Sequence, residues 1–117
     1  MLPSANRLRR SSDFSSAVRS GARVRNGRVV VHQTVRVTDA GDDAAPRVGL
    51  IVGRSVGPSV VRHRVSRRLR AQFAMRLDRL PEQSNTVVRA LPSAARATSV
   101  ELGRDLERAL TTLAGRR

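Results

Sequence analysis

The chain has 117 residues, which suits one domain with a modest hydrophobic core and is too short for two domains of ordinary size. Its 23 basic residues outnumber 9 acidic residues, and the net charge of +14, with a pI near 12.0, favours a polyanionic partner. Cysteine is absent, which excludes disulfides, thiolate metal sites and cysteine nucleophiles.

Lysine is also absent, so all 23 basic residues are arginine. The planar guanidinium group can hold a phosphate through two hydrogen bonds and can stack on a base, which suits contact with RNA. A GC-rich genome, which replaces lysine by arginine, is an alternative cause of the missing lysine. It does not explain the net charge.

Apolar runs in the sequence are short, and no apolar stretch follows the charges of MLPSANRLRR. We therefore expect neither a membrane span nor a signal peptide, and we expect the protein to be cytoplasmic. Residues 1–10 and 115–117 are expected to be flexible.

The first expected element is a short helix over residues 12–20. Ser11, Ser12 and Asp13 offer N-cap side chains, and Gly21 can end the helix. Next, the period of two in RVVVHQTVRV, residues 28–37, predicts a strand. Its core face would carry valines 29, 31, 35 and 37, and its more polar and basic face would carry Arg28, Val30, His32, Thr34 and Arg36.

A second strand is expected at RVGLIVG, residues 47–53. The segment DAGDDAAP, residues 39–46, is small, acidic and ends in proline, which is typical of an exposed connection. The two strands are therefore expected to form a hairpin with a long loop.

A long helix is expected from Pro58 to Leu80, since proline is well tolerated at the first helical position. An apolar side chain recurs every four residues and predicts the face that packs on a sheet. This stripe consists of Val61, Val65, Leu69, Phe73 and Leu77.

The same helix carries five arginines within VVRHRVSRRLR, residues 60–70. Like charges four residues apart, such as Arg64 and Arg68, cost a few tenths of a kcal/mol in an isolated helix, so the cluster is unfavourable unless an anion binds to it. A solvated helix face normally mixes both signs, yet no acidic residue occurs from Ala44 to Leu77. The pattern favours a nucleic acid as the partner.

The C-terminal part predicts a strand at residues 85–92 and a last helix opened by a capping box at Thr98 and Glu101. One side of that helix carries Leu102, Leu106, Leu110 and Leu113. The expected order of elements is thus α-β-β-α-β-α.

No catalytic set is recognisable in the sequence. His32 and His63 are the only histidines, and neither has an obvious carboxylate or nucleophile as its partner. Asp42 and Asp43 have no further acidic ligands nearby, and the glycines after the second strand lack the GxxxxGK[ST] pattern of a phosphate-binding loop.

The arrangement resembles the protein subunit of bacterial ribonuclease P. The strongest part is RVGLIVGRSVGPSVVRHRVSRRLRAQF, residues 47–73, which is similar to the family's strand, loop and arginine-rich helix. NRLRRSSDF and VVRALP are similar to its N-terminal segment and its last strand. The centre of the family signature is usually Arg-Asn-Arg, whereas this chain has Arg62, His63 and Arg64.

The resemblance implies a role for two sets of residues. Contact with the catalytic RNA is implied for Arg54, Arg62, His63, Arg64, Arg67, Arg68 and Arg70. Contact with the single-stranded 5′ leader of precursor tRNA is implied for Phe14, Val18, His32 and Arg36. Family members often have further aromatic residues at the leader site, so base stacking is expected to be weaker here.

The resemblance also implies a fold and a reaction. The fold is an α+β or α/β two-layer sandwich with a left-handed β-α-β crossover, ribosomal protein S5 domain 2-like; periodicity alone would predict the usual right-handed crossover. The reaction is hydrolysis that releases the tRNA 5′ leader, with Mg²⁺ held mainly by the catalytic RNA and no catalytic side chain on the protein. Neither a membrane nor a protein oligomer is required.

Two other functions remain open. A basic ribosomal or RNA-assembly protein would share the charge and would assist no reaction. A metal-dependent protein nuclease would need clustered carboxylates, which the sequence does not offer.

Overall fold

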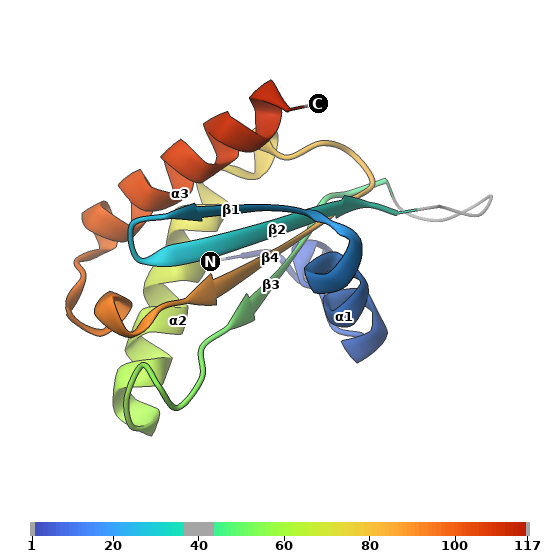
Figure 1. Ribbon diagram of the computed structural model, residues 1–117. Coiled ribbons are helices and arrows are strands. Elements are labelled where there is room, and N and C mark those ends of the chain that lie inside the picture. The colour runs from blue at the N-terminus through green and yellow to red at the C-terminus, as the bar shows by residue number, and fades with distance from the viewer. Residues whose placement is uncertain (1, 37–43, 117) are drawn as a thin grey trace.

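The computed structural model describes residues 2–36 and 44–116, and it contains a four-stranded mixed sheet with helices on both faces (Figure 1). The strands are β1 (Ala22–Asn26), β2 (Val29–Val35), β3 (Arg47–Ile51) and β4 (Ser84–Ala90). The α-helices are α1 (Ser11–Ser20), α2 (Ser59–Ala74) and α3 (Ser99–Gly115), and short 3-10 helices are η1 (Ser4–Asn6), η2 (Leu77–Arg79) and η3 (Pro92–Arg96).

The strands lie in the order β1-β2-β4-β3. β2 pairs antiparallel with both β1 and β4, whereas β3 and β4 are parallel neighbours joined through α2. In Figure 1, α2 lies behind the sheet, and the chain passes from β3 through α2 to β4 with a left-handed turn. The α+β sandwich and its unusual crossover are therefore as the resemblance implied.

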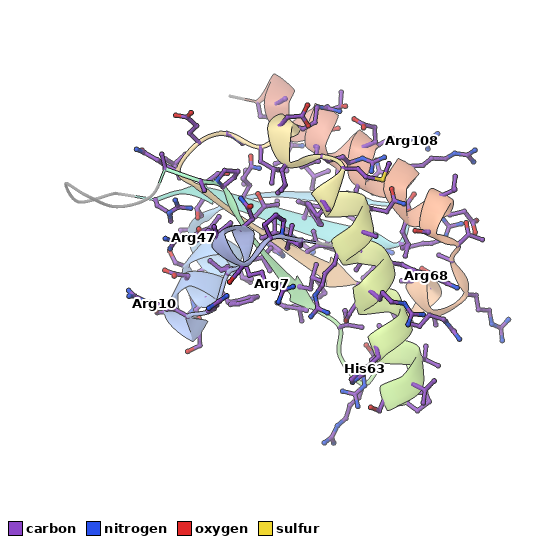
Figure 2. The ribbon with its side chains drawn as sticks, turned by 180° about the vertical axis from the view of Figure 1, so that it is seen from behind. Arg7, Arg10, Arg47, His63, Arg68 and Arg108 are labelled. Carbon is purple, nitrogen blue, oxygen red and sulfur yellow. The ribbon has the colours of Figure 1, made fainter. Side chains whose placement is uncertain are left out.

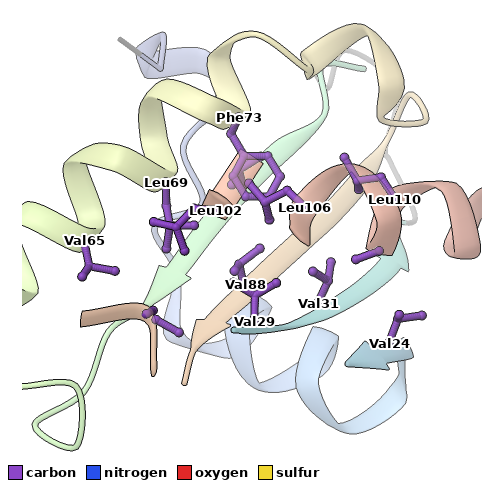
Figure 3. Packing of buried hydrophobic residues seen from close by; sticks show 14 of the residues in the cluster. Val24, Val29, Val31, Val65, Leu69, Phe73, Val88, Leu102, Leu106 and Leu110 are labelled. Atoms are coloured by element: carbon purple, nitrogen blue, oxygen red, sulfur yellow. The ribbon is translucent and has the colours of Figure 1, made fainter. Parts of the chain in front are cut away.

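The two faces of the sheet are covered unequally. α2 and α3 pack on one face over the main core, in which Leu69, Phe73 and Leu106 meet Val31 and Val88 (Figure 3). All five side chains are fully buried. α1 packs on the opposite face over a smaller cluster and leaves part of that face uncovered.

The apolar patterns of both long helices are confirmed. Val65, Leu69 and Phe73 of α2 are buried, with Val61 and Leu77 packed at the ends of the stripe. The four leucines expected on one side of α3 are also buried.

The predicted capping box at the start of α3 is confirmed as well. The Thr98 hydroxyl accepts a hydrogen bond from Glu101 N at 3.1 Å, and the Glu101 carboxylate accepts one from Thr98 N at 3.0 Å. These two bonds satisfy backbone donors that the first turn of a helix leaves without partners.

The sequence patterns did not predict strand β1. It forms a hairpin with β2 through Gly27 and Arg28, and Gly27 has a φ of 55°, which suits the first position of a two-residue hairpin loop. A glycine at the first loop position is a signal for such a turn. Arg28 therefore lies in the loop, and β2 begins at Val29.

The expected hairpin between residues 28–37 and 47–53 is wrong. β4 lies between β2 and β3 and pairs with both. Val35, expected on the core face, is 71% exposed at the last position of β2. Val37 and residues 39–43 lie outside the described residues.

The expected helix from Pro58 to Leu80 is too long. α2 ends at Ala74, after which η2 turns the chain and Leu80 returns to the core at 6% exposure. β4 also ends at Ala90, before the expected Pro92, because Pro92 opens η3.

The N-terminal segment, expected to be flexible, is packed onto the sheet. Leu2 and Leu8 are 2% and 7% exposed. Leu8 N donates a hydrogen bond to Val48 O at 2.8 Å, so this segment lies along the outer edge of β3.

Candidate RNA interface

Four of the five arginines of α2 fall into two groups. Arg64 Nη2 donates a hydrogen bond to Ala95 O at 2.9 Å, and Arg68 Nη1 donates one to Ala97 O at 2.5 Å. Both carbonyls belong to the connection around η3. Arg64 and Arg68 thus hold this connection against α2.

The other group consists of Arg67 and Arg70, which are exposed, as is the neighbouring His63. Arg68 and His63 leave α2 on different sides (Figure 2). Together with Arg7 and Ala71, the three exposed side chains line a pocket of about 470 Å³. Within the described parts of the chain, none of the three is ion-paired to a carboxylate.

The remaining predicted contacts surround the start of α2. His63, Arg64 and Arg67 line a hollow of about 350 Å³ at its first turns. Arg62 is half-buried, and Arg54 is exposed in the turn that precedes the helix. The structure thus spreads the seven predicted residues around α2 and its approach.

A second hollow lies on the sheet face that α1 leaves uncovered. It has a volume of about 350 Å³, and its lining includes Val18 and His32, two of the four predicted leader contacts. Sequence reasoning missed the rest of the lining, which consists of Arg23, Arg25, Val30, Arg89 and Leu91. We call these seven residues the sheet cleft.

Strand register brings the cleft residues together. Arg25, Val30 and Arg89 are directly paired across β1, β2 and β4. Arg23 and His32 lie in the next row on the same face of the sheet. Correct assignment of the Gly27-Arg28 turn would have placed Arg23 and Arg25 beside β2. The position of Arg89 could be found only from the pairing of β2 with β4.

His32 is the titratable side chain at the base of the sheet cleft. Burial, followed by the charges of Arg23 and Arg89, lowers its pKa from the ordinary value of 6.5. The residue is 4% exposed, and its Nδ1 has no hydrogen-bond partner among the described residues. A neutral imidazole beside two guanidinium groups leaves the cleft positively charged.

Phe14 and Arg36 do not line the sheet cleft. The Phe14 ring packs in the smaller cluster with Leu8, over Gly49. Arg36 donates hydrogen bonds to Ser84 O at 2.9 Å and to Ala45 O at 2.8 Å, near the far end of β2. These side chains hold neighbouring parts of the fold together.

Residues 2–36 and 44–116 contain no group of three or more His, Asp or Glu side chains placed to hold a metal ion. Asp42 and Asp43 lie outside these ranges. No helix in the described parts is long and apolar enough to cross a bilayer.

A family model described as ribonuclease P matches residues 2–114. The chain belongs to the ribonuclease P protein family. Curated relatives include two proteins named ribonuclease P protein component. One, from Beutenbergia cavernae, is 50% identical, and the match covers 97% of this chain and 92% of the relative. The other, from Streptomyces bikiniensis, is 48% identical, with 98% and 97% covered.

Solved ribonuclease P proteins share the fold. One is a mutant of the Staphylococcus aureus RNase P protein with defective mRNA degradation activity. Its structure matches this one with a TM-score of 0.81 at 23% sequence identity, and the match covers 94% of this chain and 89% of that chain. The Thermotoga maritima protein has a TM-score of 0.75 at 24% identity, covering 91% and 96%. Membership supports a role as the protein subunit of ribonuclease P, an endoribonuclease, and implies an RNA partner.

Proposed function

We propose that this ribonuclease P protein binds the catalytic RNA through α2 and the 5′ leader of precursor tRNA through the sheet cleft. The observation that carries the proposal is the division of the α2 arginines. Arg64 and Arg68 are held by backbone carbonyls, whereas Arg67 and Arg70 are exposed and have no carboxylate partner in the described parts of the chain. Exposed like charges that the fold does not neutralise are suited to phosphates.

The composition of the sheet cleft supports a single-stranded ligand. Arg23, Arg25 and Arg89 supply three positive charges for a phosphate backbone, and Val18 and Val30 supply apolar surface for bases. The lining contains no Phe, Tyr or Trp ring, and the one imidazole, that of His32, is only 4% exposed. Stacking on an aromatic side chain contributes about 1 to 3 kcal/mol per base, so contacts to phosphate would dominate leader binding here.

In this proposal the chemistry takes place on RNA. Mg²⁺ would stabilise charge on the reacting phosphate, and it would be held mainly by the catalytic RNA because no carboxylate cluster is present among the described residues. The arginines of the protein would lower the repulsion between catalytic RNA and precursor tRNA. His32 and the other cleft side chains would bind and orient the leader.

The decisive experiment is cleavage of a precursor tRNA by a bacterial ribonuclease P RNA at low, near-physiological Mg²⁺. Reactions would contain the RNA alone, the protein alone, or both. We expect efficient cleavage only with both components. Absence of stimulation would favour a basic RNA-assembly protein, and cleavage by the protein alone would refute the assignment of the chemistry to RNA.

A further inference from the structure

Arg7 lies at the junction of two basic pockets. One is the 470 Å³ pocket that it shares with His63, Arg67 and Arg70 of α2. The other has a volume of about 280 Å³, and Arg7 shares it with residues of the N-terminal segment, α1 and β3. In Figure 2, Arg7 lies between Arg10 and Arg47 on one side and His63 on the other.

The second pocket is strongly basic. Its lining contains four arginines and one acidic residue, Asp13. Arg9 Nη2 donates hydrogen bonds to Ser4 O and Ser4 Oγ, so part of this guanidinium group is already bound within the N-terminal segment. Arg10 and Arg47 are in no ion pair among the described residues. The two pockets thus present same-sign charge on both sides of Arg7.

The backbone around Arg7 is held by several contacts. Leu8 N donates a hydrogen bond to Val48 O, and Asn6 Nδ2 donates one to Pro46 O at 2.8 Å. Arg7 Nε donates one to Leu2 O at 3.2 Å, and Leu2 is itself in the main core. The terminal Nη atoms of Arg7 have no hydrogen-bond or ion-pair partner within the described residues. The guanidinium group is therefore positioned by the fold while its two outer nitrogens remain available.

We propose that one continuous segment of the catalytic RNA backbone runs from α2 across Arg7 to the start of α1. We call this surface the β3-edge track, formed by Arg7, Arg10, Arg47, His63, Arg67 and Arg70. The inference rests on the proposed function and adds to it a second half of the RNA interface, contributed by the N-terminal segment. Regularly spaced phosphates match a line of arginines that lack acidic partners.

The track is assigned to the catalytic RNA because it continues the exposed side of α2. It shares no lining residue with the sheet cleft, where the leader is proposed to bind. The two RNA ligands would thus occupy separate surfaces.

The first test measures the affinity of the protein for the catalytic RNA as a function of salt concentration. Each lost phosphate contact lowers the magnitude of the log–log salt slope by about 0.7 to 0.9. We expect this reduction for Arg7→Ala, with about tenfold weaker binding. Arg67→Ala tests the α2 interface itself, and Arg108→Ala, at an exposed position on α3 away from the track, is the control.

Loss of the bond to Leu2 O could disturb the N-terminal segment in Arg7→Ala. Arg7→Lys is therefore included, with thermal unfolding of every variant. The Arg7→Lys variant retains the positive charge but lacks the guanidinium group that can hold a phosphate through two hydrogen bonds. It should therefore keep most of the salt slope and bind the RNA more weakly than the wild type. Equal slopes for wild type and Arg7→Ala would overturn the inference.

The second test asks whether one RNA segment occupies both pockets. Because the chain has no cysteine, Ala5→Cys and Ala71→Cys place a single thiol in each pocket at exposed positions. A hydroxyl-radical probe attached there should cleave neighbouring nucleotides of one RNA segment. The same probe at Ala114→Cys, exposed on α3, should not. Cleavage in unrelated RNA regions would overturn the single-segment inference.

The outcomes separate this inference from the proposed function. If Arg67→Ala weakens binding and Arg7→Ala does not, the α2 interface stands and the track is refuted. If neither substitution weakens binding of the catalytic RNA, the assignment of this RNA to α2 fails as well. If Arg7→Ala weakens only precursor tRNA bound to the preassembled complex, the track binds the leader and the assignment to catalytic RNA is overturned.

Discussion

The ring of Phe14 occupies the space directly over the backbone of Gly49, where a Cβ atom would overlap its Cε1 and Cζ atoms. The contact anchors α1 on β3 and forms part of the small cluster that also contains Leu8, Ala17 and Val87. Val18, on the same helix, lines the sheet cleft. Phe14 therefore positions the helix that forms one wall of the cleft.

We predict that Gly49→Ala destabilises the protein by about 1 to 3 kcal/mol, because the added methyl group must displace the Phe14 ring. Urea unfolding followed by circular dichroism measures the change. Gly53→Ala is a matched control, since a Cβ atom there would meet no atom within 4 Å. Equal stability of the two variants would show that α1 accommodates the change freely.

Arg89→Ala should weaken binding of precursor tRNA about tenfold and leave mature tRNA binding unchanged, because Arg89 lines the cleft proposed for the leader. Affinities of the preassembled complex for both RNAs test this. Phe14→Leu should preserve the preference for the precursor, since leucine keeps most of the apolar packing. A selective loss with Phe14→Leu at unchanged stability would instead indicate direct stacking of the ring on the leader.

Substitution of two neighbouring arginines of α2 should have different effects on stability and on RNA binding. Arg68→Ala removes the hydrogen bond to Ala97 O and should cost about 1.5 kcal/mol of unfolding free energy. Arg67→Ala should change stability by less than about 0.5 kcal/mol and weaken RNA binding about tenfold. Thermal unfolding and RNA titration of both variants test the division. An unstable Arg67→Ala protein would contradict it.

The lowered pKa of His32 predicts a specific dependence of stability on pH. Unfolded His32 takes up a proton near pH 6.5, whereas folded His32 does so only at lower pH. Its contribution to stability is therefore fully present above about pH 6.5 and is lost as the pH falls through the lowered pKa. Urea unfolding of wild type and His32→Leu between about pH 5 and pH 8 should show a smaller pH dependence in the variant. Parallel curves would mean that folding leaves the protonation of His32 unchanged.

Asp105 should be the most costly acidic residue to remove from α3. It is 6% exposed and accepts hydrogen bonds from Arg28 N and Arg28 Nη1, both at 3.1 Å, which fixes the β1–β2 hairpin to α3. Asp105→Ala should cost about 2 to 3 kcal/mol of unfolding free energy. Glu107→Ala removes the pairing with Arg76 and Arg79 at a more exposed site and should cost less than about 1 kcal/mol. The reverse order in chemical unfolding would refute this assignment.

Local spacing was sufficient to predict the helical faces and the start of α3. Leu69 and Phe73 lie on a stripe with the helical period, and Thr98 and Glu101 are three residues apart in a capping box. Both features join residues within one or two turns, so they need no knowledge of the partner element. The basic composition of residues 60–70 likewise indicated an RNA partner.

The arrangement of strands and the roles of individual arginines required the folded chain. A strand offers the same backbone donors and acceptors to any neighbour, so alternation in β2 and β3 could not show that β4 lies between them. That pairing also places Arg89 in a row with Arg25. In α2, Arg64 and Arg67 look alike in the sequence, and the docking of η3 makes one a hydrogen-bond donor to Ala95 O while the other stays exposed. Composition and short-range spacing thus predict the kind of ligand, whereas contacts between distant segments select the side chains that are available to it.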